Sequence, residues 1–187
     1  MKVLRLWAAT LLVALLSACG SMNVTSDGAD SRLMLQGNDP VAYFTVGKPV
    51  KGDPAIKADH HGVTYRFSSG GNREAFARDP AKYTPQYGGF CSNGLVYAVP
   101  IAGQTDNFKI IKGKLYMFGG LGSKLFFEME EERNLKLADG YWGSEVKDSN
   151  WRIQSWKRVW FNKVPHYKTN RELAAEYEKR YGKKPGA

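Results

Sequence analysis

The stretch that most constrains the fold is residues 84–94, TPQYGGFCSNG, which holds a glycine pair directly before a cysteine. Adjacent Gly88 and Gly89 permit positive φ angles and close backbone approach that other residues tolerate poorly. Tyr87 and Phe90 flank this pair with aromatic rings. We therefore predict a tight structural corner that presents the sulfur of Cys91 at the edge of a packed region.

The N-terminus is typical of an exported protein. Residues 1–5 carry two positive charges and precede an apolar run over residues 6–16, which is too short for a permanent membrane span. The run ends in Leu-Ser-Ala-Cys at residues 16–19, which resembles the bacterial lipobox. We expect residues 1–18 to be a signal peptide and Cys19 to be acylated, so that its lipid chains hold the protein to a bilayer. The alternative is an ordinary secretory signal with a chance cysteine.

These features predict a lipid-anchored, periplasm-facing protein of the bacterial envelope. Gly20 rather than Asp follows Cys19, which favours the outer membrane. Residues 19–32 are mostly small and polar, so we predict a flexible tether there. With Cys19 acylated, Cys91 has no disulfide partner in an oxidising compartment, and a buried inert thiol is the simplest alternative to a functional one.

The net charge of +9 is concentrated in the C-terminal part of the chain. Residues 147–187 carry 11 Lys/Arg and 4 Asp/Glu, whereas residues 19–146 carry 14 of each kind. Hydrophobic content of 43% and charged content of 24% are ordinary for a globular protein. An envelope location makes nucleic acid an unlikely partner, so we expect none.

Residues 33–120 read as a small α+β unit. Residues 63–67 alternate apolar and polar side chains, which predicts a half-buried strand, and the tetrad at 59–62 predicts the tip of a hairpin. Ser68 or Ser69 caps a predicted helix over residues 71–78, which Pro80 ends. Residues 108–111 and 115–118 predict a second hairpin.

Six motifs in this unit resemble the YHS domain family, in its bacterial envelope branch. In order they are residues 37–44 (GNDPVAYF), 62–69 (GVTYRFSS), 72–76 (NREAF), 79–83 (DPAKY), 87–91 (YGGFC) and 113–116 (GKLY). The resemblance implies a treble-clef-like module related to domains that bind or traffic metals. In the metal-binding branch two cysteines stand where this chain has Ser68 and Asn72, so that shared metal site is not carried over. Some envelope relatives carry selenocysteine at the position of Cys91, which implies redox or soft-metal chemistry there.

Three functional interpretations follow. The first is a binding module in which Cys91, with His60 and His61 as further ligands, holds a soft metal ion, copper being favoured. The second is a redox protein in which neighbouring backbone amides lower the thiol pKa of Cys91. The third is a structural or interaction lipoprotein with an inert thiol. Adjacent histidines on a strand face opposite ways, so an exposed turn explains this pair better than joint binding of a metal does. The absence of a CxxC pair or of a hydrolytic motif favours a protein that is not an enzyme.

Other candidate ligands are better explained by packing. Asp39 precedes a proline and fits a turn, and His166 lies in a basic aromatic stretch. Met34, Met117 and Met129 are scattered along the chain, which favours core or surface packing over a thioether site for copper.

Residues 121–187 are predicted to form a mainly helical, Trp-rich extension, beginning with one helix over residues 123–138. Trp142, Trp151, Trp156 and Trp160 alternate with lysines and arginines, which fits an anionic membrane surface or an acidic protein partner. The alternative is that the tryptophans pack against the module. Thr169 to Glu172 form a capping box for a last helix that ends at Gly182, with a stripe of Leu173, Tyr177 and Tyr181.

Overall fold

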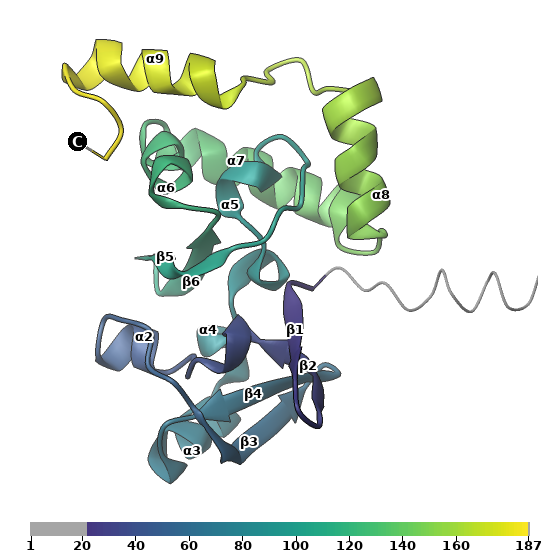
Figure 1. The fold of residues 1–187 in the computed structure, drawn as a ribbon, viewed down its shortest axis with the longest axis vertical. Coiled ribbons are helices and arrows are strands. Elements are labelled where there is room, and N and C mark those ends of the chain that lie inside the picture. Colours follow the sequence, from purple (N-terminus) through teal and green to yellow (C-terminus); the bar gives the residue numbers. More distant parts are fainter. Residues whose placement is uncertain (1–21, 187) are drawn as a thin grey trace, which may run out of the picture.

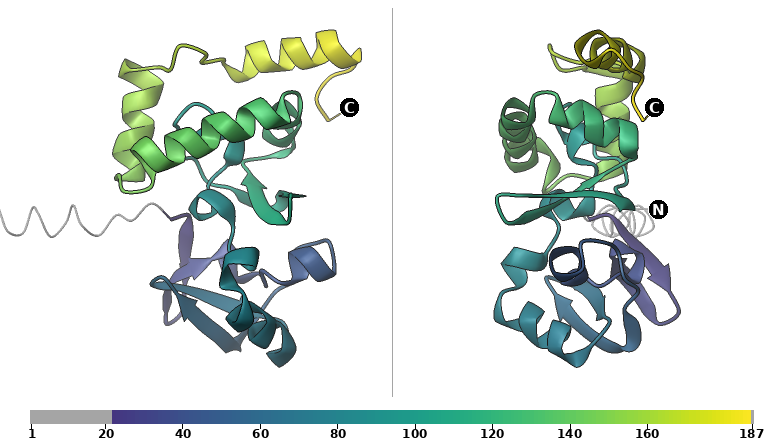
Figure 2. Two further views of the ribbon diagram at one scale, coloured as in Figure 1. Left: turned by 180° about the vertical axis from the view of Figure 1, so that it is seen from behind. Right: turned by 90° about the vertical axis from the view of Figure 1, so that its left-hand side faces the viewer.

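The computed structural model describes residues 22–186, which form two regions stacked along the long axis of the molecule (Figure 1). The first region, residues 22–85, holds a four-stranded sheet and short helices. The second region, residues 86–186, holds a two-stranded hairpin and most of the helices (Figure 2). The predicted signal peptide and Cys19 lie outside the described residues. Within residues 22–186, none of the helices has the length and apolar character needed to cross a bilayer.

The four-stranded sheet has the order β1-β2-β4-β3, with strands β1 (Val24–Asp27), β2 (Asp30–Met34), β3 (Asp53–His60) and β4 (Val63–Phe67). β2 and β4 are parallel with Leu33 opposite Thr64, whereas the other two pairs are antiparallel. The predicted hairpin is confirmed, because β3 and β4 pair around a tip at His61 and Gly62. The alternation of β4 places Val63, Tyr65 and Phe67 in the core, as the sequence predicts.

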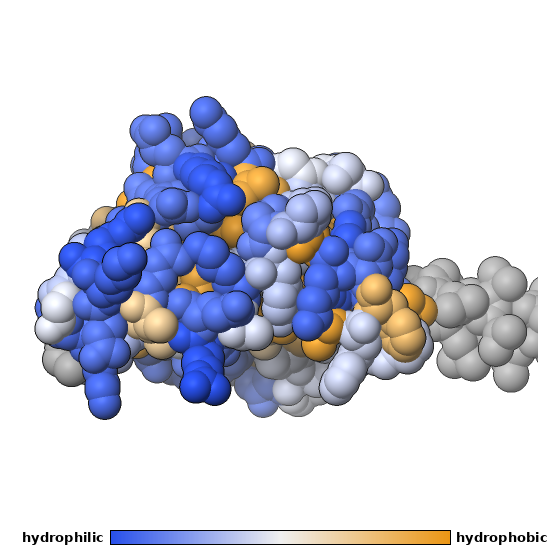
Figure 3. Space-filling view, turned by 90° about the horizontal axis from the view of Figure 1, so that it is seen from above, coloured by the Kyte–Doolittle hydropathy of each residue, from blue (hydrophilic) through white to orange (hydrophobic). Residues whose placement is uncertain are grey.

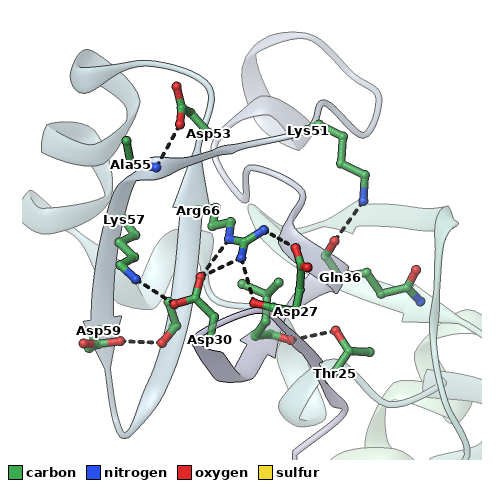
Figure 4. Close-up of polar contacts among 12 residues, drawn as sticks. Thr25, Asp27, Asp30, Gln36, Lys51, Asp53, Ala55, Lys57, Asp59 and Arg66 are labelled. Carbon is green, nitrogen blue, oxygen red and sulfur yellow. Dashed lines mark hydrogen bonds and ion pairs between the residues drawn. The ribbon is translucent and has the colours of Figure 1, made fainter.

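The tether prediction is wrong for residues 24–32, which form β1 and most of β2. Asp30 is buried between two cations: Lys57 Nζ lies 2.7 Å from Oδ1, and Arg66 Nε lies 2.9 Å from Oδ2 (Figure 4). Asp27 adds a second carboxylate to Arg66 at 2.5 Å. These ion pairs order a segment whose small polar residues resemble a linker, because the cationic partners lie far along the chain.

Short helices complete the first region. They are η1 (Leu35–Gly37), α2 (Ala42–Thr45), α3 (Gly70–Arg78) and α4 (Pro80–Tyr83). The helix predicted over residues 71–78 is confirmed: Asn72 N donates to the Ser69 cap at 3.1 Å, and Phe76 lies in the core. Pro80 follows the end of α3 and also begins α4, whose N-cap is Asp79.

The second hairpin joins the two regions. It consists of β5 (Gln104–Ile111) and β6 (Lys114–Phe118), as predicted. Because side chains alternate along a strand, β6 serves two cores. Leu115 and Met117 pack in the core of the first region, whereas Tyr116 and Phe118 pack in the core of the second. The corner before this hairpin contains η2 (Gln86–Gly89) and α5 (Ser92–Leu95).

The C-terminal extension is helical, as predicted. Its elements are α6 (Leu121–Glu128), α7 (Glu131–Tyr141), the π-helical turn η3 (Trp142–Val146), α8 (Trp151–Trp156), the π-helical turn η4 (Lys157–Phe161) and α9 (Asn170–Tyr181). Phe127 and Ala138 share a core with Phe90 and Phe118, so the extension packs onto the corner and the hairpin.

Two details of the extension differ from the predictions. The single helix over residues 123–138 is wrong, because Glu130 leaves helical geometry at φ −140° and ψ 52°, and the Asn134 side chain donates to the Phe127 carbonyl at 2.9 Å across the break. The capping box and the Gly182 end of α9 are confirmed. Of the predicted stripe, Leu173 and Tyr177 are buried but Tyr181 is exposed.

Candidate functional site

The corner at residues 86–91 adopts the unusual backbone that its glycines predict. Tyr87, Gly88 and Gly89 have φ angles of 54°, 59° and 80°, three left-handed residues in succession. This conformation is sterically unfavourable for Tyr87, because the residue carries a Cβ atom. Its ring is held in the second core and its hydroxyl donates to Asp139 Oδ1 at 2.8 Å, which explains how the strained conformation persists.

Cys91 follows this corner but is not presented at an edge. Its exposed fraction is 0%, which corrects the prediction of an accessible sulfur. Its backbone N–H donates to the Ile101 carbonyl at 2.8 Å, and the neighbouring Ser92 hydroxyl donates to the Met117 carbonyl at 3.0 Å. The cysteine therefore lies at the junction of the corner and β6.

Four donor groups lie near enough to the Cys91 sulfur to lower the pKa of its thiol. They are the backbone N–H groups of Gly94, Gly119 and Asn93 and the hydroxyl of Ser123. We call this arrangement the thiol nest. A Cβ atom added at Gly119 would lie 3.5 Å from Sγ, which shows that Gly119 is in direct contact range of the sulfur. Gly94 and Asn93 are neighbours of Cys91 in the sequence, whereas Gly119 and Ser123 are members that the sequence did not indicate.

Two opposing effects act on the pKa of the Cys91 thiol. Burial raises the pKa of the Cys91 thiol, and the hydrogen bonds from Gly94, Gly119, Asn93 and Ser123 lower it by less. The net direction is upward, so the resting group is a thiol rather than the low-pKa thiolate of the redox interpretation. The same donors nevertheless favour the charged form of the sulfur over the neutral thiol.

A cavity of about 270 Å³ borders the thiol nest. On one side its lining includes Asn93, Gly94 and Ser123, which are members of the nest, together with Ile101. On the other side the lining comes from the C-terminal segment: Val159, Tyr167, Lys168, Thr169 and Asn170. Lys168 pairs with Glu176, so its charge is partly neutralised. The extension therefore forms one wall of a cavity whose opposite wall contains residues that surround the thiol; Cys91 itself does not line it.

The predicted histidine ligands lie in the other region. His60 and His61 are at the tip of the β3–β4 hairpin, with ring centroids 4.0 Å apart, and His60 packs edge-on against Phe76. Burial, and then the nearby His61, lower the pKa of His60. The structure does not bring these histidines to Cys91. Across residues 22–186, no three His, Cys, Asp or Glu side chains gather as a metal site would require, and copper binding stays a prediction.

Ser68 and Asn72 do come together, around a carboxylate. Asp39 Oδ2 accepts from Ser68 N at 2.8 Å, Ser68 Oγ at 2.7 Å and Asn72 Nδ2 at 2.6 Å, while Oδ1 accepts from Val41 N at 2.8 Å. We call these four residues the Asp39 cluster. Ser68 and Asn72 thus act here as hydrogen-bond donors to a buried carboxylate. The Asn-Asp-Pro motif signalled the turn but not this role.

The remaining candidates have packing roles, as the sequence predicts. His166 Nε2 donates to the Val96 carbonyl at 2.8 Å, and its ring lies between Tyr97 and Tyr141. Met34 and Met117 are buried in the first core. Met129 packs against a small core formed by Phe126 and the α9 residues Leu173 and Tyr177.

The sequence and the structure were compared with known proteins. No family model, no curated protein and no solved structure matches the chain.

Proposed function

We propose that this protein is a lipid-anchored envelope protein that uses the Cys91 thiol for redox chemistry on a small oxidant admitted through the neighbouring cavity. The observation that carries the proposal is that four donor groups around one buried sulfur each favour its charged form. A neutral thiol is a weak acceptor and needs no such set of donors. A thiolate or a sulfenate carries the negative charge that these donors stabilise.

The chemistry is that of an isolated thiol. The Cys91 thiolate attacks one oxygen of a peroxide, so that an S–O bond forms, the O–O bond breaks, and the other oxygen leaves as water after protonation. Sulfur is oxidised to sulfenic acid while the peroxide is reduced. A low-molecular-weight thiol then displaces water to give a mixed disulfide, and a second such thiol releases reduced Cys91. An external thiol is required because the chain's other cysteine, Cys19, is the predicted lipidation site.

The cost of forming the thiolate sets the rate of this reaction. Because burial raises the thiol pKa, only a small fraction of Cys91 is ionised at neutral pH. The thiol nest stabilises the product charge once it forms. We therefore expect a slow, selective sensor or scavenger rather than a fast peroxidase.

The module that holds this site is proposed to be a YHS domain of treble-clef type. Support comes from the β4–α3 junction, where Tyr65, Phe67 and Phe76 form one aromatic cluster. In this chain the junction carries the Asp39 cluster instead of a metal. The envelope location and the lipid anchor rest on the leader sequence alone.

The test is oxidation of the native protein by stoichiometric hydrogen peroxide, using residues 20–187, which retain every described element. We expect dimedone to trap a sulfenate on Cys91, detected by mass spectrometry, and Cys91→Ser to abolish the adduct. Ser123→Ala should slow its formation severalfold, because one donor of the nest is lost. Absence of an adduct unless the protein is unfolded would contradict the proposal. A parallel Cu(I) titration distinguishes the soft-metal interpretation, which requires stoichiometric copper retention that Cys91→Ser removes.

A further inference from the structure

The segment formed by α8 and η4, residues 151–161, has its polarity reversed. Gln154 and Arg158 point inward and are buried, whereas Ile153, Trp156 and Trp160 point outward. Helices on globular proteins normally bury the apolar face. This reversal requires one explanation for the buried polar side chains and another for the exposed apolar ones.

The inward polar side chains are fully satisfied. Arg158 pairs with Glu145 and donates to the Asn162 carbonyl at 2.8 Å. Gln154 donates to Glu145 Oε2 at 3.1 Å and to the Ala98 carbonyl at 3.3 Å. These bonds compensate for the burial of polar groups, so the segment is anchored by specific polar contacts and its orientation is fixed.

The outward face presents large apolar side chains to solvent. The exposed fractions are 54% for Ile153, 59% for Trp156, 72% for Trp160 and 70% for Phe161. The rings of Trp156 and Phe161 are 4.6 Å apart, and Ile153 and Trp160 lie about one helical turn from Trp156, on the same side of the segment. We call these four residues the aromatic face. Contiguous exposed apolar surface of this kind marks a protein or membrane contact.

The charged residues near the aromatic face in the sequence are all basic. Residues 149–171 contain six Lys/Arg and no Asp/Glu. Of these cations, Arg152, Lys157 and Lys163 are exposed and lie within two residues of a member of the aromatic face in the sequence, whereas Arg158 is paired with Glu145. Tryptophan and phenylalanine flanked by lysine and arginine are the side chains that enter the headgroup layer of an anionic bilayer.

The position of the aromatic face agrees with that partner. The first described strand begins on the side of the molecule where α8 lies, as two opposite views show (Figures 1 and 2). Seen from above, the surface is largely blue, and orange atoms at this end are one of several separate orange groups (Figure 3). Cys19 precedes the first described residue, Met22, by three residues, which span about 10 Å at most when extended. An anchored Cys19 would therefore keep the aromatic face near the membrane.

We propose that the aromatic face and its exposed cations bind the surface of an anionic bilayer, the same bilayer that the lipid on Cys19 would enter. The protein then lies on the membrane with α8 against it. An acidic protein partner is the less favoured occupant, because four apolar side chains at this exposure demand an apolar environment as well as negative charge. This inference does not depend on the redox chemistry of Cys91.

The test uses residues 20–187, without the lipid, and vesicles of phosphatidylcholine with or without phosphatidylglycerol. We expect sedimentation with the anionic vesicles and a blue shift of tryptophan fluorescence. The triple variant Trp156→Ser, Trp160→Ser, Phe161→Ser should bind at least tenfold more weakly. A matched control, Val46→Ser with Leu121→Ser, removes exposed apolar side chains elsewhere and should bind within twofold of the wild type.

The cations give a second readout. Lys157→Gln should weaken binding about fivefold, and the difference should shrink at high salt. Unchanged thermal unfolding would show that the variants are folded. The proposal is overturned if the wild-type chain fails to bind anionic vesicles, if the triple variant binds as well as the wild type, or if polyglutamate is bound in place of vesicles.

Discussion

Each of the two regions contains a buried polar atom on which several donors converge, and the two centres differ in what they hold. In the Asp39 cluster the acceptor is a carboxylate that receives four hydrogen bonds. In the thiol nest the acceptor is the sulfur of Cys91, which at rest is a neutral thiol, and a cavity is lined by three of the residues around it. The donors brace the fold around the carboxylate, whereas around the sulfur we propose that they prepare a reaction. The predictions below test this difference.

The largest effect is expected in the Asp39 cluster. Asp39→Ala would leave the N–H groups of Val41 and Ser68 and the Asn72 amide without their acceptor. The Val41 donor is buried, and a buried unsatisfied donor costs about 1–3 kcal/mol, whereas water can reach the exposed Ser68 and the half-buried Asn72. The free energy of unfolding should therefore fall by about 3–4 kcal/mol in urea titrations. Asp106→Ala, at an exposed carboxylate, is the control and should change it by less than about 0.5 kcal/mol. A loss as small as the control's would mean that the cluster is not a brace.

The next effect concerns the backbone of the thiol nest. A Cβ atom at Gly94 would lie 2.5 Å from the Val99 carbonyl oxygen, so Gly94→Ala must displace main chain. We expect a loss of about 2–3 kcal/mol in unfolding free energy and a change in the reactivity of Cys91. Gly140→Ala has open space around it within α7 and should be neutral or stabilising by up to about 1 kcal/mol. Equal effects at both glycines would show that the nest is not tightly built.

A smaller effect is expected at the ion pair that holds the reversed segment. The Arg158 guanidinium holds the pKa of Glu145 below its ordinary value. A lowered folded pKa means that the stabilisation is present above the ordinary glutamate pKa and is lost as pH falls through the folded pKa. Glu145→Gln should therefore cost about 1–2 kcal/mol at pH 7 and progressively less below pH 4.5.

Glu132→Gln, at an exposed position, is the control for this pair. If the cost of Glu145→Gln stayed constant down to low pH, the ion pair would not be the source of the stability.

The smallest expected effect is a pH dependence of the stability that Cys91 contributes. Because burial raises the folded pKa of the Cys91 thiol, its contribution is complete below the ordinary thiol pKa and is lost as pH rises through the folded pKa. Cys91→Ala should therefore destabilise the protein less at pH 10 than at pH 7. Burial also raises the pKa of Tyr65 and Tyr97 to about 12, but both tyrosines are present in each protein and cancel in the difference. A pH-independent difference would contradict the raised thiol pKa.

Local signals in the sequence predicted much of the fold. The alternation at residues 63–67, the Ser69 cap and the capping box at Thr169 each depend on neighbours within a few positions, and each is confirmed. The features that were missed depend on distant partners. Asp30 is ordered by Arg66, 36 residues away, and Asp39 accepts from Asn72, 33 residues away. The break at Glu130 carries no Gly or Pro, so local composition did not indicate it.

The candidate site was predicted in its centre but not in its surroundings. The glycine pair indicated the corner and singled out Cys91, because those residues are adjacent. The depth of the sulfur and the donors from Gly119 and Ser123 arise from packing of β6 and α6 against the corner, which sequence spacing does not encode. The histidines were assigned to the site by residue type alone, and the structure places them in the other region.

The central claim is that Cys91 reacts in the native state through the cavity, and the urea dependence of thiol labelling tests it most directly. A small uncharged alkylating reagent would be used at pH 8, below the unfolding transition. We predict a labelling rate that is nearly independent of urea at low concentrations, as expected for access without unfolding. A rate that rises from zero urea with the full slope of global unfolding would contradict the account and make Cys91 an inert core residue.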